Sequence, residues 1–253
     1  MKAVILAAGK GTRLGVYAKN KPKTLVEING IPLLDIILKN LIKEEVKDVL
    51  VITGYKSRRI KEFIEAGYYR INIDYLYNKV YNRTNNIYSL YLAKKRLENS
   101  EFLIINSDVL FHKDILKVLR GSSKSGVILS IDLIKKLGHE EMKVIIEDNT
   151  ISKISKEISP SIADGEYIGL AKIDKKNSRS FFEFIEKTIE VRGKKVFYEE
   201  AFQMMIDNGY RLQYESTERL PWVEIDTPED LKIAREIIAP RITRKDSLHT
   251  ELL

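Results

Sequence analysis

The sequence predicts an α/β fold of three layers, in which helices cover both faces of a mostly parallel sheet and a small, partly antiparallel extension packs against it. Three observations lead to this prediction. Up to residue 106, short apolar runs alternate with amphipathic stretches of helical length. After about residue 125, short strand-like runs follow one another with little helix between them. The first apolar run also ends in a glycine-rich loop, as the first strand of a parallel sheet often does.

The first half of the chain predicts four strands joined by three helices. Its helices show apolar residues at helical spacing, for example Leu34, Ile37, Leu38 and Leu41. Strand and helix alternation of this length implies right-handed crossovers, and therefore a Rossmann-like parallel sheet covered on both faces. The predicted strands are residues 2–7, 47–53, 71–76 and 101–106, and the predicted helices are residues 32–44, 57–66 and 85–97.

The second half predicts the extension and three closing helices. Within "DTPEDL", which opens the last helix, Thr227 can cap the helix and Pro228 can occupy its first position. We expect one domain at residues 1–240, with the extension at 126–175 and a polar tail at 241–253. The predicted strands are residues 126–134, 142–147, 150–155 and 166–173, and the predicted helices are residues 177–190, 199–208 and 228–238.

Composition excludes several classes of protein. With 253 residues and 44% hydrophobic side chains, the chain can bury a core of its own. No apolar run reaches 18 residues and the chain has no cysteine, so we expect no membrane insertion, no disulfide and a cytoplasmic location. The net charge of +7 is spread among 36 acidic residues without an arginine-rich stripe, which argues against nucleic-acid binding.

The loop after the first strand is built to approach a ligand closely. Gly9 and Gly11, with the small Ala7 and Ala8 before them, allow backbone amides to face an anion. The spacing G-x-G-T-R matches neither the dinucleotide fingerprint nor the P-loop. A basic residue in this loop and Lys23 after it could straddle a triphosphate, or could be ordinary solvated loop charges.

A longer pattern decides between these readings. "LAAGKGTRL" at 6–14 and "KPKTLVEINGIPLL" at 21–34 together resemble the signature of the nucleoside triphosphate transferases that make nucleotide-activated sugars and alcohols. The resemblance continues in Asn106-Ser107-Asp108 and in "WVEIDTPEDL" at 222–231. It covers residues 1 to about 240 and implies a GT-A-like nucleotidyltransferase fold.

The resemblance also indicates a branch of that family. "NNIYSLYLA" at 85–93 and "GEYIG" at 165–169 look most like the small cytidylyltransferases acting on phosphocholine, aminoethylphosphonate or inositol phosphate. The glycine-rich turn usual near 85–93 in sugar-specific members is absent. CTP and a phosphorylated small alcohol or phosphonate are therefore the expected substrates, and the oligomeric state stays open between monomer and homodimer.

The resemblance assigns the catalytic and metal-binding positions. It implies that Arg13 contacts the β- and γ-phosphates, that Lys23 lies over the α-phosphate, and that Asp108 and Asp226 bind Mg²⁺, which prefers oxygen ligands. Either aspartate alone could be only a helix cap or turn former. A substrate phosphate is already ionised, so the reaction needs positioning and charge rather than a side-chain base. The expected nucleotide-binding residues are Leu6, Ala7, Ala8, Gly9, Gly11, Thr12, Asn78, Asn85, Asn86 and Ser89.

The acceptor pocket is predicted from residue chemistry. An amine on the acceptor would need aromatic faces and a carboxylate, whereas an inositol ring would need carboxylates and amides that pair with hydroxyl groups. Lysines of the extension could hold the acceptor phosphate. The expected acceptor-binding residues are Lys153, Lys156, Glu166, Tyr167, Tyr198 and Trp222.

Two alternatives to a cytidylyltransferase stay open. One is a sugar-1-phosphate nucleotidyltransferase that uses UTP, dTTP or GTP. The other is a nucleotide-binding regulatory subunit without turnover, but such subunits usually lose the lysine or an aspartate, and Lys23, Asp108 and Asp226 are all present.

Overall fold

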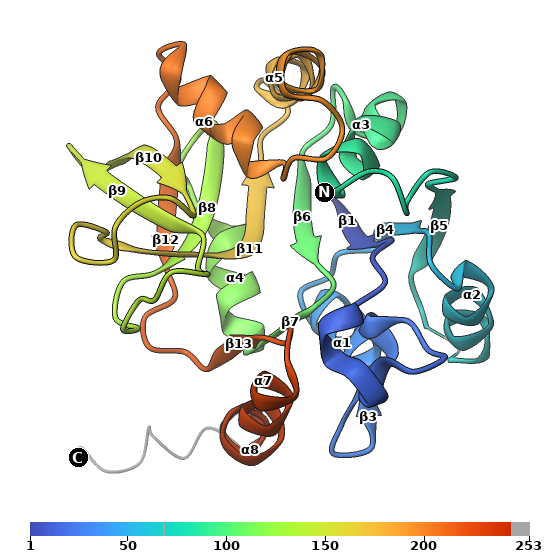
Figure 1. Ribbon diagram of the computed structural model, residues 1–253. Helices are drawn as coiled ribbons and strands as arrows, with labels where there is room; N and C mark the ends of the chain where they lie inside the picture. Colours follow the sequence, from blue (N-terminus) through green and yellow to red (C-terminus); the bar gives the residue numbers. More distant parts are fainter. Residues whose placement is uncertain (68, 244–253) are drawn as a thin grey trace.

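A parallel four-stranded sheet forms the centre of the molecule in the computed structural model, which describes residues 1–67 and 69–243 (Figure 1). Its strands are β1 (Lys2–Ala7), β4 (Asp48–Thr53), β5 (Asn72–Tyr77) and β6 (Phe102–Asn106). Their order is β5-β4-β1-β6, and every neighbouring pair is parallel. The chain therefore builds the sheet on one side of β1 and then crosses to the other side.

The extension continues this sheet beyond β6. β11 (Gly165–Ile173) runs antiparallel to β6 and also pairs with β8 (Val127–Asp132), which is followed by the parallel edge strand β12 (Gln213–Ser216). β9 (Lys143–Glu147) and β10 (Thr150–Ser155) form a hairpin beside the first residues of β11. These nine strands of the described residues form one mixed sheet, which confirms the predicted partly antiparallel extension.

Helices cover both faces of the sheet, as the sequence predicts. Along β1, Ala3 and Ile5 face one hydrophobic core while Val4 and Leu6 face the other. Burying each large aliphatic side chain in these cores stabilises the fold by about 1.5–3 kcal/mol. The lower layer in Figure 1 contains α1 (Leu33–Lys43), α2 (Ser57–Ala66), α4 (Lys113–Gly121) and α7 (Pro228–Ile233), and the upper layer contains α3 (Asn86–Leu97), α5 (Ser178–Arg192) and α6 (Glu199–Asp207).

The last predicted helix extends further than expected. After α7, a π-helical turn (Ala234–Ile238) and α8 (Ala239–Thr243) continue the same rod, so residues 241–243 are helical rather than part of a tail. Thr227 caps α7 in a capping box with Asp230, as predicted. The remainder of the predicted tail, residues 244–253, lies outside the described residues. No helix in the described ranges is both long enough and apolar enough to cross a membrane.

Several short elements escaped the sequence prediction, and two of them shape the site. β7 (Val109–Phe111) and β13 (Trp222–Glu224) pair as a separate antiparallel ribbon. The amide of Ile225 donates to the carbonyl of Asp108 at 2.9 Å, which extends the pairing. Segments more than 110 residues apart are thereby held side by side. The other missed elements are α4, β12 and the small hairpin of β2 (Glu27–Ile28) and β3 (Ile31–Pro32).

The crossover at β1 leaves a crevice at the carboxyl ends of β1 and β6. In open α/β sheets, ligands bind at such a switch point because the two following loops diverge there. Here the Ser107 hydroxyl donates to the carbonyl of Leu6 at 2.7 Å and ties the two loops together. The loop with the glycines and the loop with Asp108 therefore lie next to each other, and both line one crevice.

A bulge in β11 opens the crevice on its far side. The pairing of β11 with β8 shifts register between Tyr167 and Ala171, and Gly169 adopts a φ of 83°. A Cβ atom on Gly169 would lie 2.6 Å from Nδ2 of Asn106. Only glycine therefore allows both this left-handed backbone and the close approach of the Asn106 side chain.

We predict that Gly169→Ala destabilises the fold more than Gly30→Ala. Gly30 also has a positive φ, of 85°, but a Cβ there would meet open space. Both variants incur about 1–2 kcal/mol of backbone strain, and only Gly169→Ala adds about 1–3 kcal/mol of overpacking against Asn106. Chemical unfolding of the two variants measures the difference. Equal losses in the free energy of unfolding would contradict the proposed steric role of Asn106.

Candidate active site

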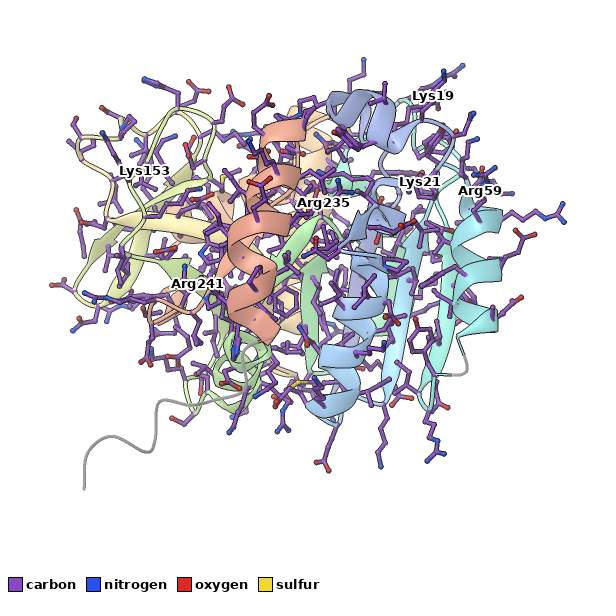
Figure 2. The ribbon with its side chains drawn as sticks, turned by 90° about the horizontal axis from the view of Figure 1, so that it is seen from below. Lys19, Lys21, Arg59, Lys153, Arg235 and Arg241 are labelled. Carbon is purple, nitrogen blue, oxygen red and sulfur yellow. The ribbon has the colours of Figure 1, made fainter. Side chains whose placement is uncertain are left out.

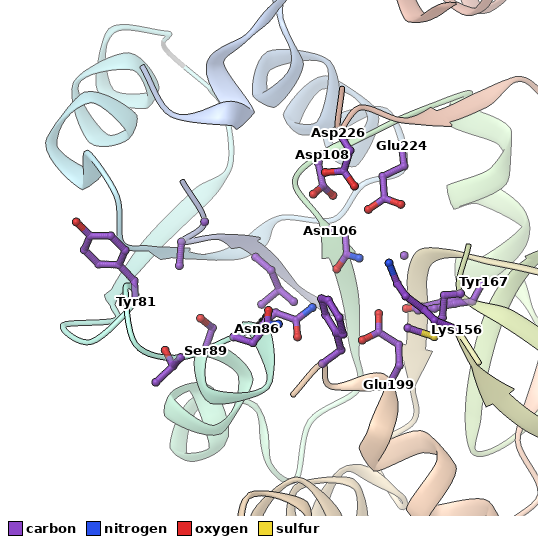
Figure 3. Close-up of a pocket in the computed structure, with 18 of the residues that line it drawn as sticks. Tyr81, Asn86, Ser89, Asn106, Asp108, Lys156, Tyr167, Glu199, Glu224 and Asp226 are labelled. Atoms are coloured by element: carbon purple, nitrogen blue, oxygen red, sulfur yellow. Dashed lines mark hydrogen bonds between the residues drawn. The ribbon is translucent and has the colours of Figure 1, made fainter. Parts of the chain in front are cut away.

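A pocket occupies the crevice between the glycine loop, the start of α3, the Asp108 loop and the extension (Figure 3). Polar side chains dominate its wall, and they come from segments spread over most of the chain. The lining residues are Leu6, Ala8, Gly9, Arg13, Asn78, Tyr81, Thr84, Asn85, Asn86, Ser89, Asn106, Asp108, Met142, Lys156, Tyr167, Ile168, Gly169, Phe197, Glu199, Glu224 and Asp226.

Lys23 lies between the two predicted metal-binding aspartates. Its Nζ is 2.8 Å from Oδ2 of Asp108 and also forms an ion pair with Asp226. Arg13 reaches the other oxygen of Asp226 at 2.5 Å. Burial alone lowers the pKa of Lys23, but the charges of Asp108 and Asp226 outweigh it and raise the pKa above 10.5. The ammonium group is therefore charged at neutral pH and points at the acidic cluster.

Glycine at position 11 allows this placement of Lys23. Gly11 has a φ of 63°, and a Cβ there would lie 2.6 Å from Cβ of Lys23. The backbone of the glycine loop therefore packs against the side chain of Lys23, which begins the 3₁₀ turn Lys23–Leu25. This close packing brings the two parts of the opening signature together in space, although nine residues separate Arg13 from Lys23 in the sequence.

Glu224 is a third carboxylate in this cluster, which the sequence analysis missed. Asp108, Glu224 and Asp226 each offer an oxygen that lies within 4.8 Å of the others, and Figure 3 shows the three side chains facing one another. Desolvation in the pocket, followed by repulsion from Asp108 and Asp226, raises the pKa of Glu224. The Oδ1 atom of Asp108 is buried without a hydrogen-bond partner. Hard oxygen donors with an unsatisfied member fit a divalent cation such as Mg²⁺.

The loop before α3 is held by a network around Asn78. Its Nδ2 donates to Thr84 Oγ1 and to Ser89 Oγ, both at 3.2 Å, and its Oδ1 accepts from the amide of Val80. Asn78 is only 1% exposed, so its side chain has little capacity left for a ligand. Asn78 and Ser89 therefore shape the loop, although both line the pocket as expected.

Asn85 and Asn86 occupy the start of α3. Asn85 is the N-cap residue, and its side-chain oxygen accepts from the amide of Asn86. The Oδ1 atom of Asn86 accepts from the amide of Tyr198 at 3.0 Å. Asn85 thus caps α3, while Asn86 links α3 to the segment before α6.

The other predicted nucleotide-binding residues divide between pocket and interior. Leu6, Ala8 and Gly9 line the pocket. Ala7 faces the lower core, because successive residues of β1 point to opposite faces. Gly11 packs against Lys23, and Thr12 begins the 3₁₀ helix Thr12–Ala18, so neither lines the pocket.

The structure brings two of the six predicted acceptor residues, Lys156 and Tyr167, into the pocket. Lys153 is exposed on the surface of the extension (Figure 2). Tyr198 is completely buried. Its hydroxyl group lies 2.8 Å from the hydroxyl group of Tyr167 and donates to Oδ1 of Asn106 at 3.3 Å. Tyr198 therefore supports the pocket wall from behind.

Glu166 and Trp222 lie outside the pocket and contact one surface loop. Glu166 forms an ion pair with Lys135 at 2.8 Å, and it points away from the pocket because its neighbour in β11, Tyr167, points toward it. The indole Nε1 of Trp222 donates to Asp132 at 2.6 Å, and Lys135 lies over its ring. Both residues thus anchor the segment after β8.

The structure adds further residues that the sequence analysis did not assign. Glu199 follows Tyr198 and opens a helix, where acidic residues are common without any ligand, so the sequence carried no signal. Glu224 stands two residues before Asp226 in the quoted late motif, and alternation along a strand could have placed it on the same side. The added lining residues are Tyr81, Thr84, Asn106, Met142, Ile168, Gly169, Phe197, Glu199 and Glu224.

The chain is similar in sequence to known proteins. Choline-phosphate cytidylyltransferase of Streptococcus pneumoniae is 37% identical over 117 residues, which cover 46% of this chain and 48% of that protein. Bifunctional protein GlmU of Methanocaldococcus jannaschii is 27% identical over 96% of this chain and 55% of its own length. The chain thus spans about half the length of these curated relatives.

Solved structures show the same fold. The inositol-1-phosphate CTP transferase from T. maritima superposes with a TM-score of 0.82 over 96% of both chains, at 23% identity. A profile of the family described as nucleotidyl transferase matches residues 2–152, which is more than half of the chain. The chain belongs to the nucleotidyl transferase family.

Proposed function

We propose that this chain catalyses Mg²⁺-dependent transfer of a cytidylyl group from CTP to a phosphorylated small alcohol or phosphonate, with release of pyrophosphate. The observation that carries the proposal is the position of Lys23, whose Nζ contacts both Asp108 and Asp226 beside the glycine loop. An arginine and three carboxylates line one end of the pocket. Lys23 is not itself a lining residue, but its ammonium contacts two of these carboxylates, and the whole arrangement suits a triphosphate with its cation.

The reaction requires charge and alignment more than proton transfer. An ionised oxygen of the acceptor attacks the α-phosphorus, the bond from that phosphorus to the bridging oxygen of pyrophosphate breaks, and negative charge grows on the phosphoryl oxygens. Lys23 would stabilise this charge, and Arg13 would hold the outer phosphates through its planar fork. Asp108, Glu224 and Asp226 would hold Mg²⁺, which supplies charge neutralisation on the phosphates when it is bound.

CTP is the preferred nucleotide because several relatives carry names of CTP-dependent enzymes. Besides the choline-phosphate relative, CTP:phosphoglutamine cytidylyltransferase of Campylobacter jejuni is 24% identical over 93% of this chain and 100% of its own length. A sugar-1-phosphate substrate is the second candidate. It is favoured by the fold shared with UDP-glucose pyrophosphorylase, whose structure with UDP-glucose superposes on 92% of this chain with a TM-score of 0.76 at 16% identity. A regulatory subunit without turnover is disfavoured because Lys23 and all three carboxylates are present and adjacent.

A pyrophosphate-release assay tests the proposal directly. ATP, GTP, CTP, UTP and dTTP are each combined with phosphocholine, 2-aminoethylphosphonate, inositol-1-phosphate and common sugar-1-phosphates in the presence of Mg²⁺. We expect release with CTP and one of the first three acceptors. Release only with sugar-1-phosphates would support the second candidate, and no release in any combination would support the regulatory subunit.

We predict that Lys23→Ala lowers kcat by roughly 10²–10³ and weakens CTP binding much less, because Lys23 acts on charge that develops in the transition state. Lys21→Ala is the matched control, since Lys21 pairs with Glu27 outside the pocket at 3.4 Å. Thermal unfolding of both variants shows whether the unpaired aspartates impair the fold. Equal losses of binding and of kcat in Lys23→Ala would contradict the transition-state role.

Because the pKa of Glu224 is raised, we predict that Mg²⁺ binds more tightly as the pH rises. Its pKa is raised above the ordinary 4.5, so the carboxyl group keeps its proton below the raised pKa and must lose it to bind the cation. We expect the Mg²⁺ dissociation constant to fall by up to about tenfold per pH unit below that raised pKa and to level off above it. Calorimetric titrations with MgCl₂ between pH 5 and 9.5 measure it, because the raised pKa of Glu224 is about 8. Glu224→Gln should weaken binding and flatten this dependence, and an unchanged slope would exclude Glu224 as a ligand.

A further inference from the structure

The segment just before α6 presents two side chains to the pocket from a fixed backbone. The amide of Tyr198 donates to Asn86, and its hydroxyl contacts Tyr167 and Asn106 in the interior. Tyr198 is 0% exposed, so it anchors the segment. Its two neighbours, Phe197 and Glu199, both line the pocket. They therefore hold defined positions in the part of the pocket that also contains Lys156.

One carboxylate oxygen of Glu199 has no hydrogen-bond partner among the described residues. Its side chain lines the pocket, the residue is 5% exposed, and its Oε2 atom is buried with no hydrogen-bond partner. Burial raises the pKa of Glu199 to about 7, since the ionised form lacks sufficient stabilisation. A buried polar atom without a partner is costly, and a donor from a ligand would remove that cost.

The ring of Phe197 provides the second half of a cation site. Phe197 is 41% exposed, and the ammonium of Lys156 lies over its ring, 5.3 Å from the centroid. Figure 3 shows the tip of Lys156 between Glu199 and Glu224. A protein ammonium thus already occupies this environment, although it leaves Oε2 of Glu199 without a partner. An aromatic face beside a carboxylate is a favourable environment for an ammonium group.

We propose that Glu199 and Phe197 bind the ammonium group of an acceptor that is a primary amine with a terminal phosphate or phosphonate. This inference rests on the proposed function, which leaves the acceptor open. A primary ammonium has N–H groups that can donate to Oε2 of Glu199, whereas a quaternary ammonium has none. Lys156, which lies in the same part of the pocket, carries the opposite charge to the acceptor's phosphate or phosphonate and would bind it.

The experiment compares two acceptors that differ in one group. 2-Aminoethylphosphonate and n-propylphosphonate have nearly the same shape, but only the first carries an ammonium. With saturating CTP and Mg²⁺, we expect the wild-type kcat/KM to be roughly 10- to 100-fold higher for the amine. Glu199→Gln should remove most of this preference by raising KM for the amine. The KM for CTP and the kcat/KM for propylphosphonate should stay within about twofold.

Glu200→Gln serves as the matched control for folding and charge. Glu200 is the next residue of α6, and it forms an ion pair with Arg192 outside the pocket. We expect its kinetics to match the wild type. Phe197→Leu, which removes the aromatic face and keeps an apolar side chain, should lower the preference for the amine by a smaller factor than Glu199→Gln.

The outcomes separate this inference from the proposed function. Turnover with inositol-1-phosphate or a sugar-1-phosphate but no preference for the amine would overturn the inference alone. An equal loss for both phosphonates in Glu199→Gln would show a structural role and also overturn it. If no acceptor supports turnover, the proposed function fails. Calorimetry with 2-aminoethylphosphonate then decides the inference, because Glu199→Gln must weaken its binding by a similar factor, and unchanged binding would refute it.

Discussion

The contact of one ammonium group with two carboxylates connects the parts of the site. Lys23 belongs to the signature at the start of the chain, Asp108 follows β6, and Asp226 follows a strand near the other end. Removing one partner from such a part-buried group is costly, on the order of 3–5 kcal/mol, since it leaves a charge without compensation. The backbone must therefore hold three distant segments in register, and much of the fold around the crevice achieves this.

The antiparallel pairing of β7 with β13 holds the acidic residues close together. Its strands are three residues each, too short for a hydrophobic pattern to reveal, and β13 has no partner in its own part of the sequence. Pairing Val109 with Glu224 places Asp108 and Asp226 at the same end of the ribbon. The negative charges concentrated there repel one another, and a bound divalent cation would relieve that repulsion.

Sequence patterns predicted the large elements well because those elements depend on local periodicity. Ile5 and Val51 lie in apolar runs, and α1 has its apolar residues on one face, so their burial follows from spacing alone. Family resemblance supplied Lys23 and the two aspartates. Glu199 and the roles of Tyr198 and Trp222 could not be predicted, because each depends on which distant residue happens to face it. Trp222 contacts Asp132 and Lys135, and neither contact leaves a pattern near position 222.

The hydrogen bond from the Tyr198 amide to Asn86 directly connects two segments that line the pocket, the start of α3 and the segment before α6. Asn86 begins α3 on the side expected to hold the nucleotide, and Tyr198 carries the residues expected to hold the acceptor. A displacement of the first turn of α3 would therefore move Phe197 and Glu199 as well. Linkage requires that, if the first substrate aligns this segment for the second, the second strengthens the first by the same factor. Any such cooperativity would pass through a single hydrogen bond between residues that lie 112 positions apart in the chain.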